Sequence, residues 1–181
     1  MSNKKAKTVG RSFRINEQWL NTLDLEAERA GLSTNALLNR ILQEYSENQR
    51  FVRRFGGIII YRKGLSLLLD ACPNEHVGNV ARIMGEGVVK DLFRTWGIKC
   101  DYEGFTYFVR RILGVYENWF TCERSIIQDT EYFHLRHDMG EKWSIYLSEL
   151  LATVFHSCCN RRMKIELMES AVTLEIPISP S

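Results

Sequence analysis

The sequence predicts an α+β chain in two parts: a small N-terminal module of one strand and two helices, then a separate α+β domain with a mainly antiparallel sheet. Three patterns predict this division. They are a strand-like alternation before residue 16, helical spacing of apolar residues behind it, and mixed helical and strand-like runs in the remainder. The expected boundaries are a basic flexible arm at 1–7, the module at 8–48, a linker at 49–57 and the second domain at 58–178.

Composition excludes several classes of protein. The chain has 181 residues, of which 45% are hydrophobic, so it can form a packed core. No apolar run approaches the roughly 20 residues that span a bilayer, and no apolar segment typical of a signal peptide follows the polar N-terminus. The five cysteines follow no metal-binding or disulfide spacing, which predicts reduced thiols. We therefore expect a cytoplasmic protein without a membrane partner.

Charge is unevenly distributed along the chain. Residues 1–63 hold 12 Lys/Arg against 6 Asp/Glu, whereas the remainder holds 12 against 16, although the net charge is only +2. Such asymmetry indicates that the N-terminal part faces nucleic acid and that the rest has a different role.

The first expected element is a lone strand. Its alternation places Phe13 and Ile15 on one face and Gly10, Ser12 and Arg14 on the other. The residues behind it carry helical spacing, so no nearby segment can supply a second strand. The backbone groups of this strand therefore need a partner from elsewhere.

Two amphipathic helices are expected next. Asn16 is suited to cap the first helix, Gly31 to terminate it in a left-handed conformation, and Ser33 to cap the second. The apolar stripes of the two helices are Trp19, Leu20, Leu23 and Ala27, then Leu37, Leu38, Ile41, Leu42 and Tyr45. One strand and two helices bury too little apolar surface to be stable alone. We expect two copies of the strand to pair antiparallel in a homodimer.

The second helix opens with the motif GLSTNALL, Gly31–Leu38. With the strand, the cap and the first helix before it, the stretch Arg11–Tyr45 resembles the ribbon-helix-helix (Arc/MetJ-type) family of prokaryotic repressors. The resemblance implies a two-stranded β-ribbon, one strand from each subunit, that enters the major groove of double-stranded DNA.

The resemblance also implies which residues contact DNA. Gly10, Ser12 and Arg14 would face the bases. Arg14 can donate two hydrogen bonds to a guanine edge, whereas Gly10 offers no side chain. The basic arm and the start of the second helix would contact phosphates. The predicted phosphate contacts are Lys4, Lys5, Lys7, Ser33, Thr34 and Asn35.

The second domain matches no family that we recognise. Its expected elements are a short strand at 58–61, helices at 66–71, 74–97, 105–116 and from 138 onward, strands at 119–127 and 131–137, and a hairpin over 163–176 that turns at 169–170. Aromatic residues crowd the segment 102–120. Core packing is the default explanation for them, and a pocket for a small apolar effector is the alternative.

Motifs of catalysis are absent from the sequence. The segment Met84–Lys90 superficially resembles a phosphate loop, but it lacks the third glycine and lies within a helical pattern. His134 and His137 would point to opposite faces of a strand, which suits joint metal ligation poorly. Residues that could join one of them through the fold are His76, His156, Cys158 and Cys159. We expect no enzyme activity, no cofactor and no resident metal.

These observations predict a sequence-specific DNA-binding transcriptional regulator of the repressor type. The second domain would provide oligomerisation, up to a tetramer, or would sense a signal. Two alternatives stay open at this point: a protein-interaction module such as an antitoxin-like regulator that binds a partner, and a metal-sensing regulator.

Overall fold

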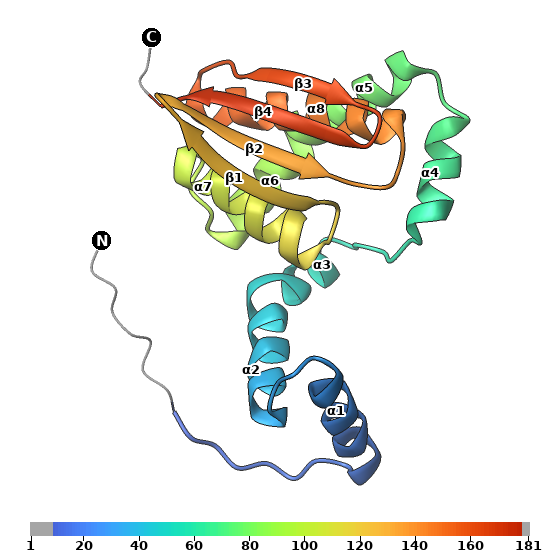
Figure 1. The fold of residues 1–181 in the computed structure, drawn as a ribbon, viewed down its shortest axis with the longest axis vertical. Coiled ribbons are helices and arrows are strands. Elements are labelled where there is room, and N and C mark those ends of the chain that lie inside the picture. The colour runs from blue at the N-terminus through green and yellow to red at the C-terminus, as the bar shows by residue number, and fades with distance from the viewer. Residues whose placement is uncertain (1–8, 179–181) are drawn as a thin grey trace. The chain divides into compact units, whose positions relative to one another are not determined.

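The computed structural model describes residues 9–178 of the chain. The chain divides into two compact units, Met1–Glu47 (unit 1) and Asn48–Ser181 (unit 2) (Figure 1). The π-helical segment η1 (Tyr45–Gln49) crosses the division. All strands of the described residues belong to unit 2.

Unit 1 is a pair of helices, α1 (Glu17–Arg29) and α2 (Thr34–Glu44). Asn16 and Ser33 cap them, and the side chain of each accepts a hydrogen bond from a backbone N–H two or three residues further on, at 2.9 and 3.2 Å respectively. Both caps were predicted from the sequence and are confirmed. A capping residue acts on its immediate neighbours, so local sequence is enough to identify it.

The turn between α1 and α2 depends on Gly31, which has a φ of +65°. The next residue, Leu32, donates its backbone N–H to the carbonyl oxygen of Ala27 at 2.9 Å, and this hydrogen bond caps the C-terminus of α1. A side chain at a positive φ is strained, and glycine avoids that cost. The sequence prediction that Gly31 terminates the first helix is therefore confirmed.

The predicted N-terminal strand is not formed. Residues 9–16 lead into α1 without regular structure, and the strands of the described chain all lie between residues 121 and 177 (Figure 1). A strand is defined by the partner it pairs with, and a single chain supplies no partner near this segment. The predicted ribbon-helix-helix fold of the N-terminal part is therefore wrong for this chain: unit 1 is a helix pair preceded by an irregular segment.

Unit 2 begins with helices. Their bounds are α3 (Arg50–Arg54), α4 (Arg62–Asp70), α5 (Asn74–Ile83), the π-helical η2 (Met84–Val88), α6 (Val89–Trp96), α7 (Tyr102–Tyr107), the π-helical η3 (Phe108–Tyr116) and, after two strands, α8 (Glu141–Cys159). The segment 49–57, expected as a linker, holds α3. Its buried Phe51 ring lies 5.4 Å from the ring of Trp96.

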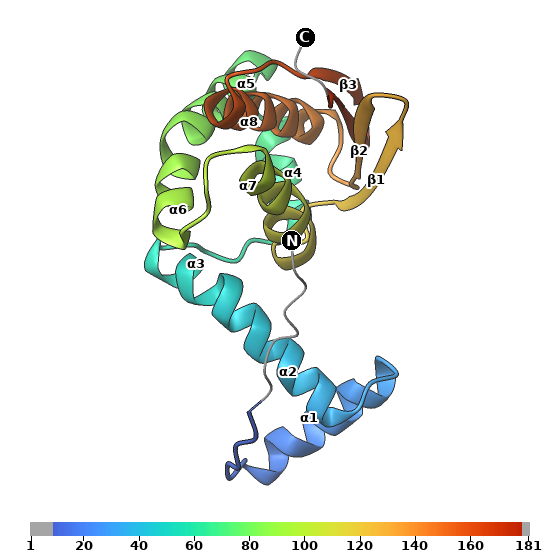
Figure 2. The same cartoon turned by 90° about the vertical axis from the view of Figure 1, so that its left-hand side faces the viewer.

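A four-stranded antiparallel sheet completes unit 2. Its strands are β1 (Thr121–Ile127), β2 (Thr130–Arg136), β3 (Lys164–Met168) and β4 (Ala171–Pro177), in the spatial order β1-β2-β4-β3. The helices cover one face of the sheet (Figure 2). The α+β class with an antiparallel sheet, predicted for this part of the chain, is confirmed.

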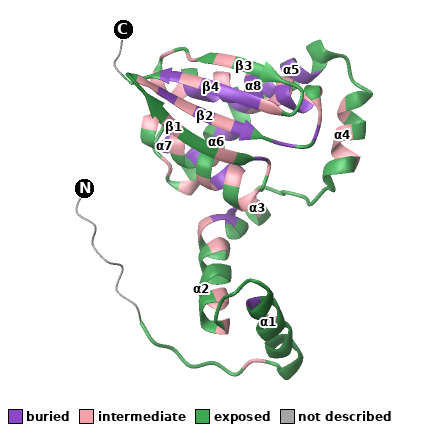
Figure 3. Ribbon diagram, in the orientation of Figure 1, coloured by how far each residue is buried: buried purple, intermediate pink, exposed green. Residues whose placement is uncertain are grey.

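The core of unit 2 lies between α8 and the covered face of the sheet. Buried apolar residues fall on alternate positions of the two central strands, and those of α8 recur at helical spacing. The largest of these fully buried side chains are Phe133, Leu135, Leu147, Leu151, Phe155, Leu174 and Ile176. Burial of this kind is concentrated in unit 2 (Figure 3).

Two local expectations in unit 2 are wrong. The apolar run at 58–61 forms no strand, and Ile58 and Ile59 are 84% and 100% exposed. Helix α8 begins at Glu141 rather than at Asp138, whose carboxylate instead pairs with Arg62 at 2.9 Å. Between residues 9 and 178, no helix combines the length and the apolar composition that crossing a bilayer requires.

Candidate DNA-binding site and other functional groups

The residues expected to face DNA bases lie on the segment before α1. Gly10, Ser12 and Arg14 are all exposed, and so are Val9 before them and Phe13 between Ser12 and Arg14. The structure therefore leaves the side chains of Ser12 and Arg14 accessible to a ligand. The predicted phosphate contacts Lys4, Lys5 and Lys7 lie outside the described residues.

The residues expected to contact phosphate at the start of α2 are partly engaged within unit 1. Ser33 Oγ accepts the capping hydrogen bond described above, and Thr34 Oγ1 donates to the carboxylate of Asp24 at 2.5 Å. Asn35 is exposed in the first turn of the helix. Backbone N–H groups at a helix start attract anions through the helix dipole. A phosphate here would be held by backbone N–H groups and Asn35 more readily than by the Thr34 hydroxyl.

Unit 1 has almost no core. Among residues 9–47, Ala27 alone is buried (Figure 3). Large apolar side chains are exposed instead, and we call them the apolar surface of unit 1: Val9, Phe13, Trp19, Leu20, Leu25, Leu32, Ile41, Leu42 and Tyr45. So many exposed apolar side chains on a small unit are typical of a surface that meets another molecule.

The histidines proposed as metal ligands have other roles. His134 Nδ1 lies 3.1 Å from Thr173 Oγ1 across the sheet. His137 is buried at the end of β2, where its Nε2 lies 3.0 Å from Ser144 Oγ, and Ser144 in turn donates to the carbonyl oxygen of Met168 at 2.6 Å. Across the described residues 9–178, no three side chains of His, Cys, Asp or Glu gather in a group that could hold a metal ion.

The protonation state of His137 follows from its partners. The backbone N–H of Met139 donates to Nδ1 at 3.4 Å, so the proton sits on Nε2 and is donated to Ser144. Burial of the ring lowers the pKa of His137 below its ordinary value. The neutral imidazole therefore ties the end of β2 to α8 as a structural group.

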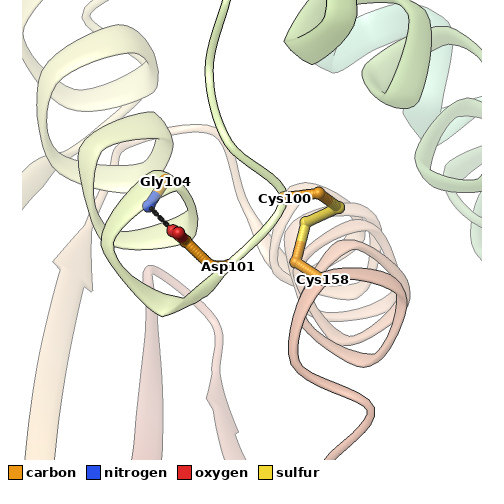
Figure 4. The surroundings of a disulfide bond; sticks show 4 residues. All are labelled: Cys100, Asp101, Gly104 and Cys158. Carbon is orange, nitrogen blue, oxygen red and sulfur yellow. Dashed lines mark hydrogen bonds between the residues drawn. A yellow bond between two sulfur atoms is a disulfide. The ribbon is translucent and has the colours of Figure 1, made fainter.

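Two cysteines form a disulfide, contrary to the expectation that all five are reduced. Cys100, just before α7, is bonded to Cys158 in the last turn of α8 (Figure 4). The side chain of Asp101 caps α7 beside the bond by accepting a hydrogen bond from the Gly104 N–H at 2.8 Å. The two cysteines are 58 residues apart, so their spacing in the sequence does not reveal the pairing.

The remaining described thiols are Cys72, Cys122 and Cys159. Burial raises the pKa of Cys122 to about 11 and also raises that of Cys159. A raised pKa keeps a thiol protonated and therefore weakly nucleophilic. Neither of these two cysteines has the properties of a reactive nucleophile.

No family model, no curated protein and no solved structure matches this chain. The resemblance of Arg11–Tyr45 to repressors of the ribbon-helix-helix type consequently remains an interpretation of the residues alone.

Proposed function

We propose that the chain is a sequence-specific DNA-binding transcriptional regulator that acts as a homodimer assembled through unit 1. The observation that carries the proposal is the missing core of unit 1, in which Ala27 alone is buried among residues 9–47. A helix pair of this size cannot offset its conformational entropy without burying more apolar surface. Unit 1 therefore needs a partner, and a second copy of the chain offers the same surface in a two-fold arrangement.

Three features of unit 1 support DNA as its ligand. Ser12 and Arg14 are accessible side chains of the kind that read base edges. The start of α2 presents backbone N–H groups and the exposed Asn35, which suit a phosphate. Residues 1–7 carry three lysines and no acidic side chain, which favours a polyanion. A dimer would present each feature twice, so its binding site would have two-fold symmetry.

The apolar surface of unit 1 also suits a different protein, as in an antitoxin-like regulator. Unit 2 argues against that alternative, because it has a core of its own around α8. Segments that capture a partner in this way are commonly short and disordered alone. Copurification of the chain with a second protein would favour the alternative.

Sedimentation equilibrium of the intact chain tests the dimer. The expected mass is twice 21.1 kDa. Ile41→Glu puts a charge on the apolar surface of unit 1 and should shift the equilibrium strongly towards monomer. Ile59→Glu is the matched control, since Ile59 is fully exposed in unit 2, and it should leave the mass unchanged. A wild-type chain that stays monomeric and folded would contradict the proposal.

Fluorescence anisotropy with labelled duplex DNA tests the ligand. The logarithm of the binding constant should fall linearly with the logarithm of the salt concentration. The Ser12→Ala/Arg14→Ala variant should bind a preferred sequence about tenfold or more weakly than the wild type. Arg29→Ala is the control, because Arg29 pairs with Glu26 at 2.7 Å on the surface of α1. Equal affinities for the double variant and the control would remove Ser12 and Arg14 from the proposed site.

A further inference from the structure

Unit 2 contains a pocket of about 890 Å³ between α7, η3 and β1. Its volume lies within the range of sites that hold small organic ligands. The three elements that form it are neighbours in the fold (Figure 1). The sequence prediction of an apolar effector pocket concerned the same aromatic segment, but the lining also includes charged side chains.

Three guanidinium groups line the pocket: Arg110 and Arg111 from η3 and Arg124 from β1. Arg110 and Arg124 both lie close enough to the Cys122 thiol to act on its pKa, although the raising effect of burial is larger. The acidic side chain in the lining is that of Glu103, which is exposed. The lining therefore holds three basic side chains against one acidic one, and arginine is the side chain best suited to bind carboxylate or phosphate with two hydrogen bonds.

A buried carboxylate positions one of these guanidiniums. Glu131 is 2% exposed and occupies the core-facing side of β2, where Phe133 and Leu135 continue the alternation. Its carboxylate accepts hydrogen bonds from Arg124 Nε and from the Tyr102 hydroxyl. A carboxylate at a core position costs stability unless it is paired. Such a departure from the apolar pattern is expected where a site must hold a side chain in place.

Arg111, another of the three arginines, is also held in position by a neighbouring side chain. Arg111 Nε donates to the Tyr116 hydroxyl at 2.9 Å, and its guanidinium carbon lies 4.7 Å from the centre of that ring. Held in this way, Arg111 forms a fixed part of the pocket wall.

The remaining lining suits an apolar ring. Phe120 and Val115 contribute apolar surface, and Tyr107 contributes an aromatic side chain. Gly114 lies opposite β1, where an added Cβ would stand 3.7 Å from the Phe120 ring and 3.8 Å from Cys122 Cβ. These are ordinary van der Waals distances, so η3 and β1 lie close together at this end of the pocket.

We propose that this pocket binds a small organic anion with an aromatic body and a carboxylate or phosphate group. The guanidiniums of Arg110 and Arg124 contact the oxyanion, and the exposed side chains of Tyr107 and Val115 contact the ring. The ligand would act as a regulatory signal, and this role alone rests on the proposed function in DNA binding. The pocket itself belongs to unit 2.

Calorimetric titration of the intact chain, without DNA, tests the proposal with four probes. Adenosine monophosphate and salicylate are the anions, and adenosine and salicylamide are their neutral counterparts. At least one anion should bind, and its neutral counterpart should bind about tenfold or more weakly. If only adenosine monophosphate binds, the pocket takes a phosphate group; if only salicylate binds, it takes a carboxylate.

Arg110→Gln should weaken the affinity for the anion that binds about tenfold, because a guanidinium that contacts the oxyanion is lost. Arg110 is exposed, so its replacement leaves the core intact. Arg136→Gln is the control, since Arg136 lies on the opposite face of β2 and pairs with Glu123 at 3.8 Å. Failure of both anions to bind would overturn the proposal, as would equal binding of the neutral probes or equal affinities of the two variants. Because the titration contains no DNA, such a failure would leave the proposed DNA binding untouched.

Discussion

Removing the Cys100–Cys158 disulfide should strongly destabilise unit 2. The bond joins the segment before α7 to the last turn of α8, and α8 provides much of the core (Figure 4). It closes a loop of 58 residues. Loop-closure entropy for that length corresponds to about 4 kcal/mol at 25 °C, because the bond restricts the unfolded chain.

Urea unfolding of a Cys100→Ser/Cys158→Ser variant measures this effect. With a slope of about 2 kcal/mol/M for a unit of this size, the midpoint should fall by about 2 M. Reducing the wild type should produce the same fall. Cys72→Ser is the matched control, since Cys72 is exposed and free, and it should leave the midpoint unchanged.

The reasoning would be refuted by a wild-type midpoint that does not respond to reductant, together with a titration that counts five free thiols. A second failure is also informative. If the bond is present but its removal shifts the midpoint by only a few tenths of 1 M, loop closure does not control the stability of unit 2.

Two further predictions concern His137 and the glycines of η2. The folded chain resists protonation of His137, whereas the unfolded chain takes up a proton near the ordinary pKa of 6.5. The free energy of unfolding should therefore fall more steeply below pH 6.5 in the wild type than in a His137→Gln variant, as measured by urea unfolding from pH 8 to 5. Gly85→Ala should destabilise unit 2 by about 1–3 kcal/mol, because the added Cβ would stand 2.9 Å from the Thr153 side chain. Gly87→Ala, which meets open space, should be neutral or stabilising by up to about 1 kcal/mol in thermal unfolding.

Elements that depend on neighbouring residues could be predicted from the sequence. The caps at Asn16 and Ser33 act within one helical turn. The hairpin of β3 and β4 turns at Glu169 and Ser170, where two polar residues interrupt two alternating runs. The apolar stripe of α8 recurs at helical spacing and is buried in the core. In each case the deciding interaction lies within a few residues.

Features that depend on distant partners could not be predicted. The alternation at 9–15 is compatible with a strand, but no strand forms without a second one beside it. Ile58–Tyr61 has the composition of a buried strand but is exposed. The composition of a segment does not show whether another strand lies beside it to pair with. Cys100 and Cys158 meet only after α7 and α8 have packed.

The arginine pocket was missed for the same reason. Arg110 and Arg111 come from a helix and Arg124 from a strand, and the sequence does not show that these elements are adjacent. A usable signal was present at Glu131, a carboxylate at an apolar position of an otherwise regular strand. A charged residue that interrupts a core pattern is a reason to search for the group that pairs with it.

Selection of binding sites from random duplex DNA, carried out with the intact chain and with the Ser12→Ala/Arg14→Ala variant, tests the central claim most directly. The account predicts that the wild type enriches a two-fold symmetric motif and that the variant loses it, because the bases are read by side chains of unit 1 in a dimer. If neither protein enriches a motif, unit 1 does not read DNA sequence, and the claim of a sequence-specific regulator is contradicted.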